Sequence, residues 1–222
     1  MFDQLKSLAR TAAWLLPPGR GKNRVLRLLG HDVAPTARIG ICLFRGATAV
    51  RIGSGTVLGS GNTFRGLRVL DVGEDVIIGQ FNWISTAPTL RDVSDGDHGA
   101  LRLGDHAVVT NRHYVDVSGG VVLAPFATIG GVRSTVLSHS VDLETGRQTT
   151  VAVRLAEDAF VSTNCVVMAG TRLTRRAVLA AGSVTALNRE YEPNTLFGGV
   201  PAKAIREIDG AYFHRTRAWI GR

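Results

Sequence analysis

Hydrophobic residues recur at intervals of six along most of the chain. The clearest run is Leu155, Val161, Val167, Leu173 and Leu179, and a small residue follows each of them four positions later. An α-helix has about 3.6 residues per turn, so it cannot keep this repeat on one face. Short strands joined by regular corners can, because alternate residues of a strand point to the same side. The pattern therefore predicts an inward-pointing residue at every sixth position and a small residue near each corner.

The same repeat extends over most of the preceding sequence. It appears at Val33 and Ile39, at Ile52, Leu58 and Phe64, at Val72, Ile78 and Ile84, at Leu103, Val109 and Val115, and at Leu123 and Ile129. Hexapeptide repeats are typical of parallel β-helices, in which three hexads close one triangular coil. We expect an all-β fold, a left-handed parallel β-helix of roughly five or six coils, whose repeat ends after Val184.

Interruptions of the repeat suggest how the chain is organised. Two polar inserts, at 91–100 and 141–152, fall inside the repeat, so residues 31–201 are expected to form one β-helix domain. Residues 1–30 precede it as an amphipathic helix and a linker, and residues 202–222 follow it as a short basic tail.

The N-terminal helix should end at Pro17 and Pro18, since proline cannot continue a helix. Its apolar residues are Phe2, Leu5, Leu8, Ala9, Ala12 and Leu16. Such a face either packs on the domain or lies on a membrane surface.

The net charge of +8 is concentrated at the two ends of the chain. Residues 1–30 contain six Lys or Arg and one acid, residues 202–222 contain five and two, and the remainder is balanced. Basic ends suit solvent, an anionic membrane surface or a phosphate-bearing ligand. A nucleic-acid partner is not expected, because no aromatic or groove-reading element accompanies the charge.

The two cysteines, Cys42 and Cys165, lie inside repeat units and are expected to be small buried residues rather than a disulfide pair. No apolar run is long enough to span a membrane. We therefore expect a cytoplasmic protein, with the inner face of the membrane as an alternative site of action.

Three stretches of the sequence resemble hexapeptide-repeat acyltransferases, in particular the sugar and polysaccharide O-acetyltransferases of the colanic-acid and maltose/galactoside type. The first is the repeat itself. The second is "VLAAGSVT" followed by "NREYEPNTLFGGVPAKAIREI", which is similar to the closing coil of that family and its ending. The third is "TVLSHSVDLETGRQ", in which a histidine heads a loop. The resemblance covers residues 31–208.

The resemblance implies a homotrimer that binds acetyl-CoA between neighbouring coils of two subunits. It implies direct transfer of the acetyl group to a hydroxyl of a sugar or glycan acceptor, without a metal. His139 then matches the catalytic base, and Asn111 matches, within one residue, a position that helps to bind the acceptor. Matches on the cofactor side are Thr163, Ala181 and Gly182 beside the pantetheine arm, Lys203 and Arg206 near the nucleotide, and Arg189 as a substitute for a basic residue that is missing after Thr185.

The residues themselves also point to His139. A sugar hydroxyl attacks a thioester only if a base takes its proton, and a histidine side chain suits that role at neutral pH. His113 and His139 lie four residues after Val109 and Thr135, where the repeat calls for a small residue. An imidazole fits there if it projects into a cleft. His113 is then either a substrate contact or a structural corner residue.

Two carboxylates are candidates to orient His139. Asp142 follows it by three residues, although it could also be a solvated loop residue, and Asp116 is the second candidate.

Counting three hexads per coil places Asn62, Asn82, His113 and Arg133 on successive rungs of one corner. This polar ladder either borders the acceptor groove or is a stacked corner whose members satisfy one another.

Other functions use the same scaffold. An N-acetyltransferase of an amino sugar and a non-catalytic scaffold both remain open at this stage. A γ-type carbonic anhydrase would need three zinc-binding histidines on adjacent faces, but His113 and His139 are 26 residues apart and no nearby third histidine follows them.

Overall fold

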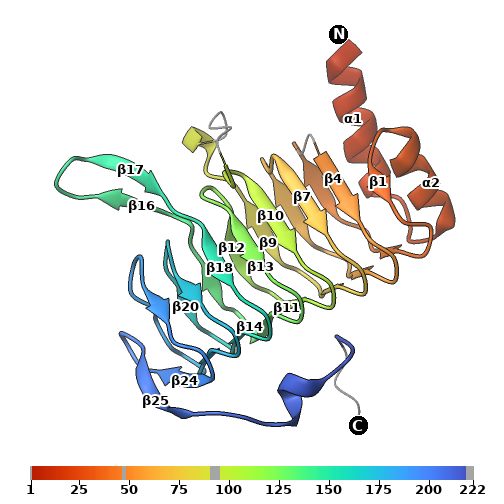
Figure 1. Ribbon diagram of the computed structural model, residues 1–222. Helices are drawn as coiled ribbons and strands as arrows, with labels where there is room; N and C mark the ends of the chain where they lie inside the picture. Colours follow the sequence, from red (N-terminus) through yellow and green to blue (C-terminus); the bar gives the residue numbers. More distant parts are fainter. Residues whose placement is uncertain (1, 47–48, 91–95, 219–222) are drawn as a thin grey trace.

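A computed structural model describes residues 2–46, 49–90 and 96–218, with side chains from residue 8 onward. The chain forms a left-handed parallel β-helix, as the repeat predicts (Figure 1). Three parallel sheets, which we call sheets A, B and C, form the three sides of the coil. Each full coil passes from sheet A to sheet B, then to sheet C, and returns to sheet A through the C–A corner.

Sheet A contains one strand from each coil. In spatial order its strands are β1 (Asp32–Val33), β4 (Ala49–Ile52), β7 (Val69–Val72), β10 (Ala100–Leu103), β13 (Val121–Leu123), β18 (Val153–Leu155), β21 (Arg172–Leu173) and β23 (Glu190–Tyr191).

Sheet B follows the same order and ends with an antiparallel strand. Its strands are β2 (Arg38–Ile39), β5 (Val57–Leu58), β8 (Ile77–Ile78), β11 (Val108–Asn111), β14 (Thr128–Val132), β19 (Phe160–Val161), β22 (Val178–Leu179), β24 (Thr195–Gly198) and β25 (Lys203–Glu207).

Sheet C is shorter, and a hairpin leaves the coil after it. The strands of sheet C are β3 (Leu43–Arg45), β6 (Thr63–Arg65), β9 (Trp83–Ser85), β12 (Tyr114–Asp116), β15 (Thr135–Val136) and β20 (Val166–Val167). The hairpin consists of β16 (His139–Asp142) and β17 (Arg147–Thr150), and it projects away from the coils in Figure 1.

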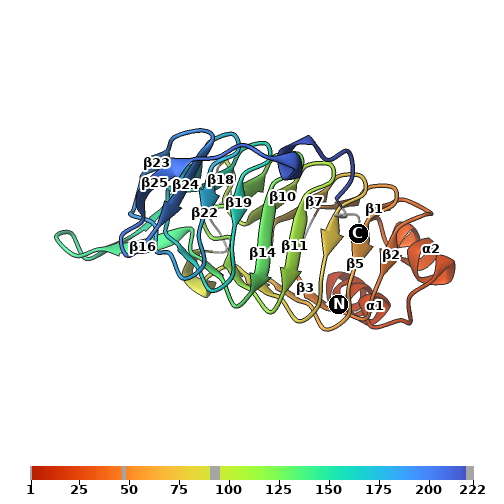
Figure 2. The same cartoon turned by 90° about the horizontal axis from the view of Figure 1, so that it is seen from below.

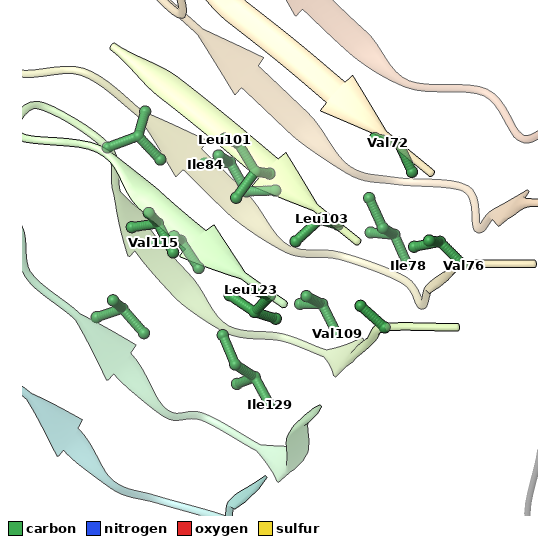
Figure 3. Packing of buried hydrophobic residues seen from close by; sticks show 14 of the residues in the cluster. Val72, Val76, Ile78, Ile84, Leu101, Leu103, Val109, Val115, Leu123 and Ile129 are labelled. Carbon is green, nitrogen blue, oxygen red and sulfur yellow. The ribbon is translucent and has the colours of Figure 1, made fainter. Parts of the chain in front are cut away.

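The core is a stack of aliphatic side chains inside the coil. Figure 3 shows residues of three successive coils, among them Val72, Leu103 and Leu123, lying above one another. The repeat predicts these inward positions correctly, and Val161 and Val167 further along are completely buried. Such stacking removes apolar surface from water at every coil, which stabilises the fold by about 25 cal/mol per Å².

The repeat continues beyond Val184, where we expected it to end. Tyr191 and Phe197 follow Leu179 at intervals of 12 and 18 residues, and both are completely buried. Their rings meet edge to face, with centroids 5.0 Å apart. The last coils therefore close the core with large aromatic rings. The described residues form six complete three-stranded coils and two partial ones, slightly more than expected.

Two helices cover the N-terminal end of the coil, α1 (Phe2–Trp14) and α2 (Arg20–Leu28) (Figure 2). The sequence predicts α1 but not α2. Of the predicted apolar face of α1, the side chains of Phe2 and Leu5 lie outside the described residues, and Leu8 is exposed. Ala9 and Ala12 are exposed, whereas Trp14 is completely buried and stacks on Phe44 with ring centroids 4.2 Å apart. The C-terminal end of α1 is therefore the part that packs on the coil, through Trp14 and the neighbouring Ala13, which is also buried.

The C-terminal segment returns across the outer face of sheet B (Figures 1 and 2). Its short 3-10 helix, η2 (Ala211–His214), brings Tyr212 to Thr128, and their hydroxyls lie 2.9 Å apart. Arg215 pairs with the buried carboxylate of Asp158 at 3.1 Å and lies over the ring of Tyr212. Residues 202–218 are thus packed on the β-helix.

Cys42 and Cys165 are both buried free thiols, as expected. Burial raises the pKa of each thiol, which makes it less reactive.

Candidate active site

The hairpin begins at His139, where the coil leaves sheet C. Residues in and beside the two polar inserts meet here. The hydroxyl of Thr89, just before the first insert, donates to Gln148 of β17 at 2.8 Å, and Nε2 of His98 lies 2.5 Å from the hydroxyl of Thr150. Thr150 is the cross-strand partner of His139. His98 of the first insert and Thr150 of the second therefore lie together beside His139, and residues 91–95 lie outside the described part of the chain. The sequence analysis did not connect His98 with this place, because the contact joins residues 52 positions apart.

His139 is held by a buried carboxylate. Its Nδ1 donates to Oδ2 of Asp116 at 2.7 Å. The side chain of Asp116 is 2% exposed, whereas that of His139 is 29% exposed. Asp116 fixes the tautomer in which Nδ1 carries the proton, so Nε2 has a free lone pair. Among the described residues, none forms a hydrogen bond with Nε2.

Two serines hold Asp116 in turn. Ser118 donates to Oδ1 through its backbone N–H at 3.1 Å and its hydroxyl at 2.5 Å. Ser138 donates to Oδ2 through its backbone N–H at 2.8 Å. Both serines are completely buried. This cluster stabilises a buried carboxylate, which would otherwise be costly in an apolar interior.

Asp142, the first candidate for orienting His139, does not form that contact. Its Oδ1 accepts the backbone N–H groups of Glu144 at 2.9 Å and Thr145 at 3.1 Å. These hydrogen bonds lower the pKa of the Asp142 carboxyl group. Asp142 stabilises the turn of its own hairpin, and Asp116 is the residue that orients His139.

One additional residue in the β14 corner shifts the repeat before His139. The register between β11 and β14 changes so that Ile129 pairs with Val109 but Val132 pairs with Asn111. Gly131 adopts φ 70°, which suits glycine at this bulge. Val136 therefore points inward instead of Thr135, and His139 does not occupy the inner corner position that we expected. The imidazole is turned outward at the C–A corner.

The same shift corrects the predicted polar ladder. Its fourth rung is Ser134, whose backbone N–H donates to Nδ1 of His113 at 3.1 Å, and Arg133 is an exposed residue beside it. Oδ1 of Asn82 accepts the N–H of His113 at 2.9 Å, and the amide of Asn82 donates to Oδ1 of Asn62 at 3.0 Å.

This ladder is internal to the β-helix. Asn62, Asn82 and His113 are at most 2% exposed. Burial lowers the pKa of His113 to about 4. The stacked-corner interpretation therefore agrees with the structure, and neither Asn82 nor His113 borders a groove. No three His, Cys, Asp or Glu side chains of the described residues are grouped as metal ligands would be.

Most residues predicted on the cofactor and acceptor side lie along the B–C corner. The N–H of Gly182 donates to the carbonyl of Thr163 at 3.0 Å, so these two positions are on adjacent coils. Ala181 and Gly182 are exposed, and the space beside Gly182 is open. Asn111 lies on the same corner, with its Oδ1 accepting the N–H of Gln80 at 2.6 Å. Arg133 is also there.

The basic residues expected near the nucleotide are separated. Lys203 and Arg206 are exposed on β25, opposite Gly198 and Leu196 of β24. Arg189 instead lies just before β23, at the C–A corner, with its guanidinium over the ring of Tyr191. The structure therefore does not group Arg189 with the other two.

The two sets of candidate residues lie at opposite edges of sheet C. His139 and Asp116 are at its C–A corner, and Thr163 and Gly182 are at its B–C corner. The outer face between them carries an apolar row. Leu43, Trp83 and Tyr114 occupy matching register positions on β3, β9 and β12 and are 43%, 44% and 44% exposed, and Thr63 of β6 lies between the first two.

Comparisons with known proteins find similar folds and one similar sequence, all at low sequence identity. No family model matches the chain. An uncharacterized protein of Dictyostelium discoideum is 28% identical over 134 residues, which are 60% of this chain. The chain spans about half the length of that relative, because the match covers 50% of it.

Solved structures that resemble the fold include two acyltransferases. A mutant of AntD, an N-acyltransferase from Bacillus cereus in complex with dTDP and coenzyme A, matches with a TM-score of 0.57 at 14% identity, covering 74% of this chain and 86% of that one. LpxA, a UDP-N-acetylglucosamine acyltransferase from Bacteroides fragilis, matches with a TM-score of 0.54 at 13% identity, covering 80% and 61%. At these identities the likeness concerns the fold alone, a β-helix that this chain shares with the two acyltransferases.

Proposed function

We propose that the protein is an O-acetyltransferase that moves an acetyl group from acetyl-CoA to a hydroxyl of a sugar or polysaccharide precursor. The observation that carries the proposal is the hydrogen bond between His139 and the buried Asp116 at the corner where the β16–β17 hairpin leaves the coil. A repeat that only had to stack would not need an oriented, half-exposed imidazole at this corner.

The geometry supports general-base catalysis by His139. Asp116 holds the proton on Nδ1, so Nε2 takes the proton of the acceptor hydroxyl as its oxygen attacks the thioester carbonyl. The tetrahedral intermediate then collapses, the carbon–sulfur bond breaks, and the imidazolium returns the proton to the leaving thiolate. Asp116 stabilises the imidazolium between these steps. A base in this position accelerates such reactions by roughly 10²–10⁴.

On this proposal acetyl-CoA lies along the B–C corner. The exposed backbone at Ala181 and Gly182 suits an extended, amide-bearing pantetheine arm, and no side chain obstructs it at Gly182. Lys203 and Arg206 lie on β25 and supply positive charge for the phosphate groups of the nucleotide. Thr163 has a structural role, because its hydroxyl accepts the backbone N–H of Val132 and donates to the carbonyl of the same residue.

We infer that a complete site uses two copies of the chain. His139 and the B–C corner lie at opposite edges of sheet C, so a neighbouring copy can bring a second B–C corner close to the base. If the apolar row on sheet C packs against neighbouring copies, the C–A corner of one meets the B–C corner of the next. Such unlike corners close into a ring, and three sheet C faces around one axis give the homotrimer.

The direct test is an assay of purified protein with acetyl-CoA and a panel of nucleotide sugars, free sugars and lipid-linked glycans. Release of free CoA thiol and the mass of the product are measured for the wild type and for His139→Ala. We expect acceptor-dependent CoA release that falls at least about a hundredfold in the variant. A folded His139→Ala protein with full activity contradicts the proposal.

The same assay separates the other functions. Transfer to an amine rather than a hydroxyl identifies an N-acetyltransferase, and calorimetry without any acetyl-CoA binding identifies a scaffold. The two buried free thiols support a reducing compartment, so we place the reaction in the cytoplasm.

A further inference from the structure

The N-terminal end of the molecule combines positive charge with exposed apolar side chains. Residues 4–31 contain six Lys or Arg and no Asp or Glu. At the turn between α1 and α2, Leu15 and Leu16 are 48% and 37% exposed, and Leu28 at the end of α2 is 80% exposed.

The outer face of α2 carries the charge. Arg20, Arg24 and Leu28 are spaced at four-residue intervals and therefore share one face of the helix. The opposite face is buried on the coil through Asn23 and Leu26. Among the described residues, no carboxylate pairs with Arg20 or Arg24.

A buried lysine holds the turn between α1 and α2 in place. Lys22 is 2% exposed, and its ammonium donates to the carbonyls of Trp14 and Gly40 at 2.6 Å and of Leu16 at 3.1 Å. Trp14, next to Leu15, is completely buried. Leu15 and Leu16 therefore project from a fixed backbone and lose little conformational freedom when they are covered.

We propose that Leu15, Leu16, Arg20, Arg24 and Leu28, which we call the basic end, dock the protein on an anionic lipid surface. Leucines beside unpaired arginines suit the boundary between acyl chains and anionic headgroups. A second copy of the chain suits it less, because a two-fold contact would set Arg20 and Arg24 against the same residues. Neither helix in the described part of the chain has the length and apolar character that a membrane span needs.

Docking at this end would hold the candidate active site at a fixed height. The basic end lies at the opposite end of the coil from the hairpin (Figure 1). His139 follows β15, four strand spacings along sheet C from β3, against which α1 packs. That corresponds to roughly 19 Å above the first coil. An acceptor carried on a lipid could reach it with its sugar portion.

Vesicle sedimentation of the full chain tests the proposal. The vesicles are phosphatidylcholine alone or phosphatidylcholine with about one third phosphatidylglycerol. We expect binding to the anionic vesicles only, weakened by salt because screening shortens the reach of the charges. Arg20→Ser with Arg24→Ser should weaken binding by roughly 25-fold, at about fivefold per arginine. Leu15→Ser with Leu16→Ser should weaken it at low and high salt alike.

Matched controls change the opposite end of the coil. Arg172→Ser with Arg175→Ser, and Leu187→Ser with Val200→Ser, should bind as the wild type does. Absence of wild-type binding at low salt overturns the proposal, as does equal loss in the controls, which would indicate diffuse charge. A smaller particle mass of the leucine variant by light scattering, without wild-type vesicle binding, would identify the basic end as a contact between copies. The assay involves no acyl transfer, so its outcome is independent of the proposed function.

Discussion

Oδ2 of the buried Asp116 lies 2.7 Å from Nδ1 of the half-exposed His139. Asp116→Asn keeps the shape of the side chain but lets an amide face Nδ1. The imidazole then carries its proton on Nε2, where it cannot act as a base. We expect kcat to fall by about 10²–10⁴, with KM for acetyl-CoA little changed.

The control for this prediction is Asp142→Asn. Asp142 bonds only to the turn of its hairpin, so activity should stay within about twofold of the wild type. Circular dichroism verifies that both variants are folded. Equal losses in the two would show that the hairpin, rather than the Asp116–His139 contact, carries the effect.

A site built from two corners can be tested by mixing variants. Gly182 has φ 72° and open space beside it, and asparagine tolerates that conformation, so Gly182→Asn should fold and obstruct the B–C corner. His139→Ala inactivates the C–A corner. Each variant alone should be nearly inactive. Refolding them together in equal amounts should restore about one quarter of wild-type activity, because one interface in four then joins two intact corners.

Separate refolding followed by mixing on ice serves as the control, since copies cannot exchange. If the site were contained within one chain, co-refolding would restore nothing. Light scattering on the wild type gives the number of copies, for which we expect three.

The repeat alone predicts the coil, its inward residues up to Val184 and the place where the hairpin interrupts it. It could not predict the bulge at Gly131. The hexads on either side of the additional residue keep their own six-residue spacing, so nothing in them marks the corner that holds it. That single residue moves His139 outward and replaces Arg133 by Ser134 on the polar ladder. The sequence ranks Asp116 only second for a related reason. It is 23 residues from His139, and only the stacking of coils brings the two together.

The polar ladder should contribute to stability and not to acceptor binding. Asn82→Ala would leave the N–H of His113 and the carbonyl of Thr110 without their partners in a buried corner. We expect a loss of about 2–4 kcal/mol in the free energy of unfolding, measured in urea. KM for the acceptor should be unchanged. A raised KM without lost stability would return Asn82 to the acceptor site.

Acid should destabilise the protein through two buried histidines. Burial lowers the pKa of His113 to about 4, and burial together with the charge of Arg10 lowers the pKa of His31 to about 4. Both values lie below the usual value of about 6.5. Between those pH values the unfolded chain binds more protons than the folded one, so stability falls as pH falls. Each histidine should remove about 2 kcal/mol of unfolding free energy between about pH 7 and about pH 5.

His113→Asn separates this contribution from general acid effects. Asparagine already fills the two preceding rungs, Asn62 and Asn82, so it should accept the N–H of Ser134 in place of the imidazole. The variant should therefore lose about 2 kcal/mol less than the wild type when urea unfolding is compared at the two pH values. His214→Asn, at an exposed position of η2, is the matched control and should leave the pH dependence unchanged. If the wild type and His113→Asn lost the same unfolding free energy between the two pH values, His113 would not stay neutral in the folded protein.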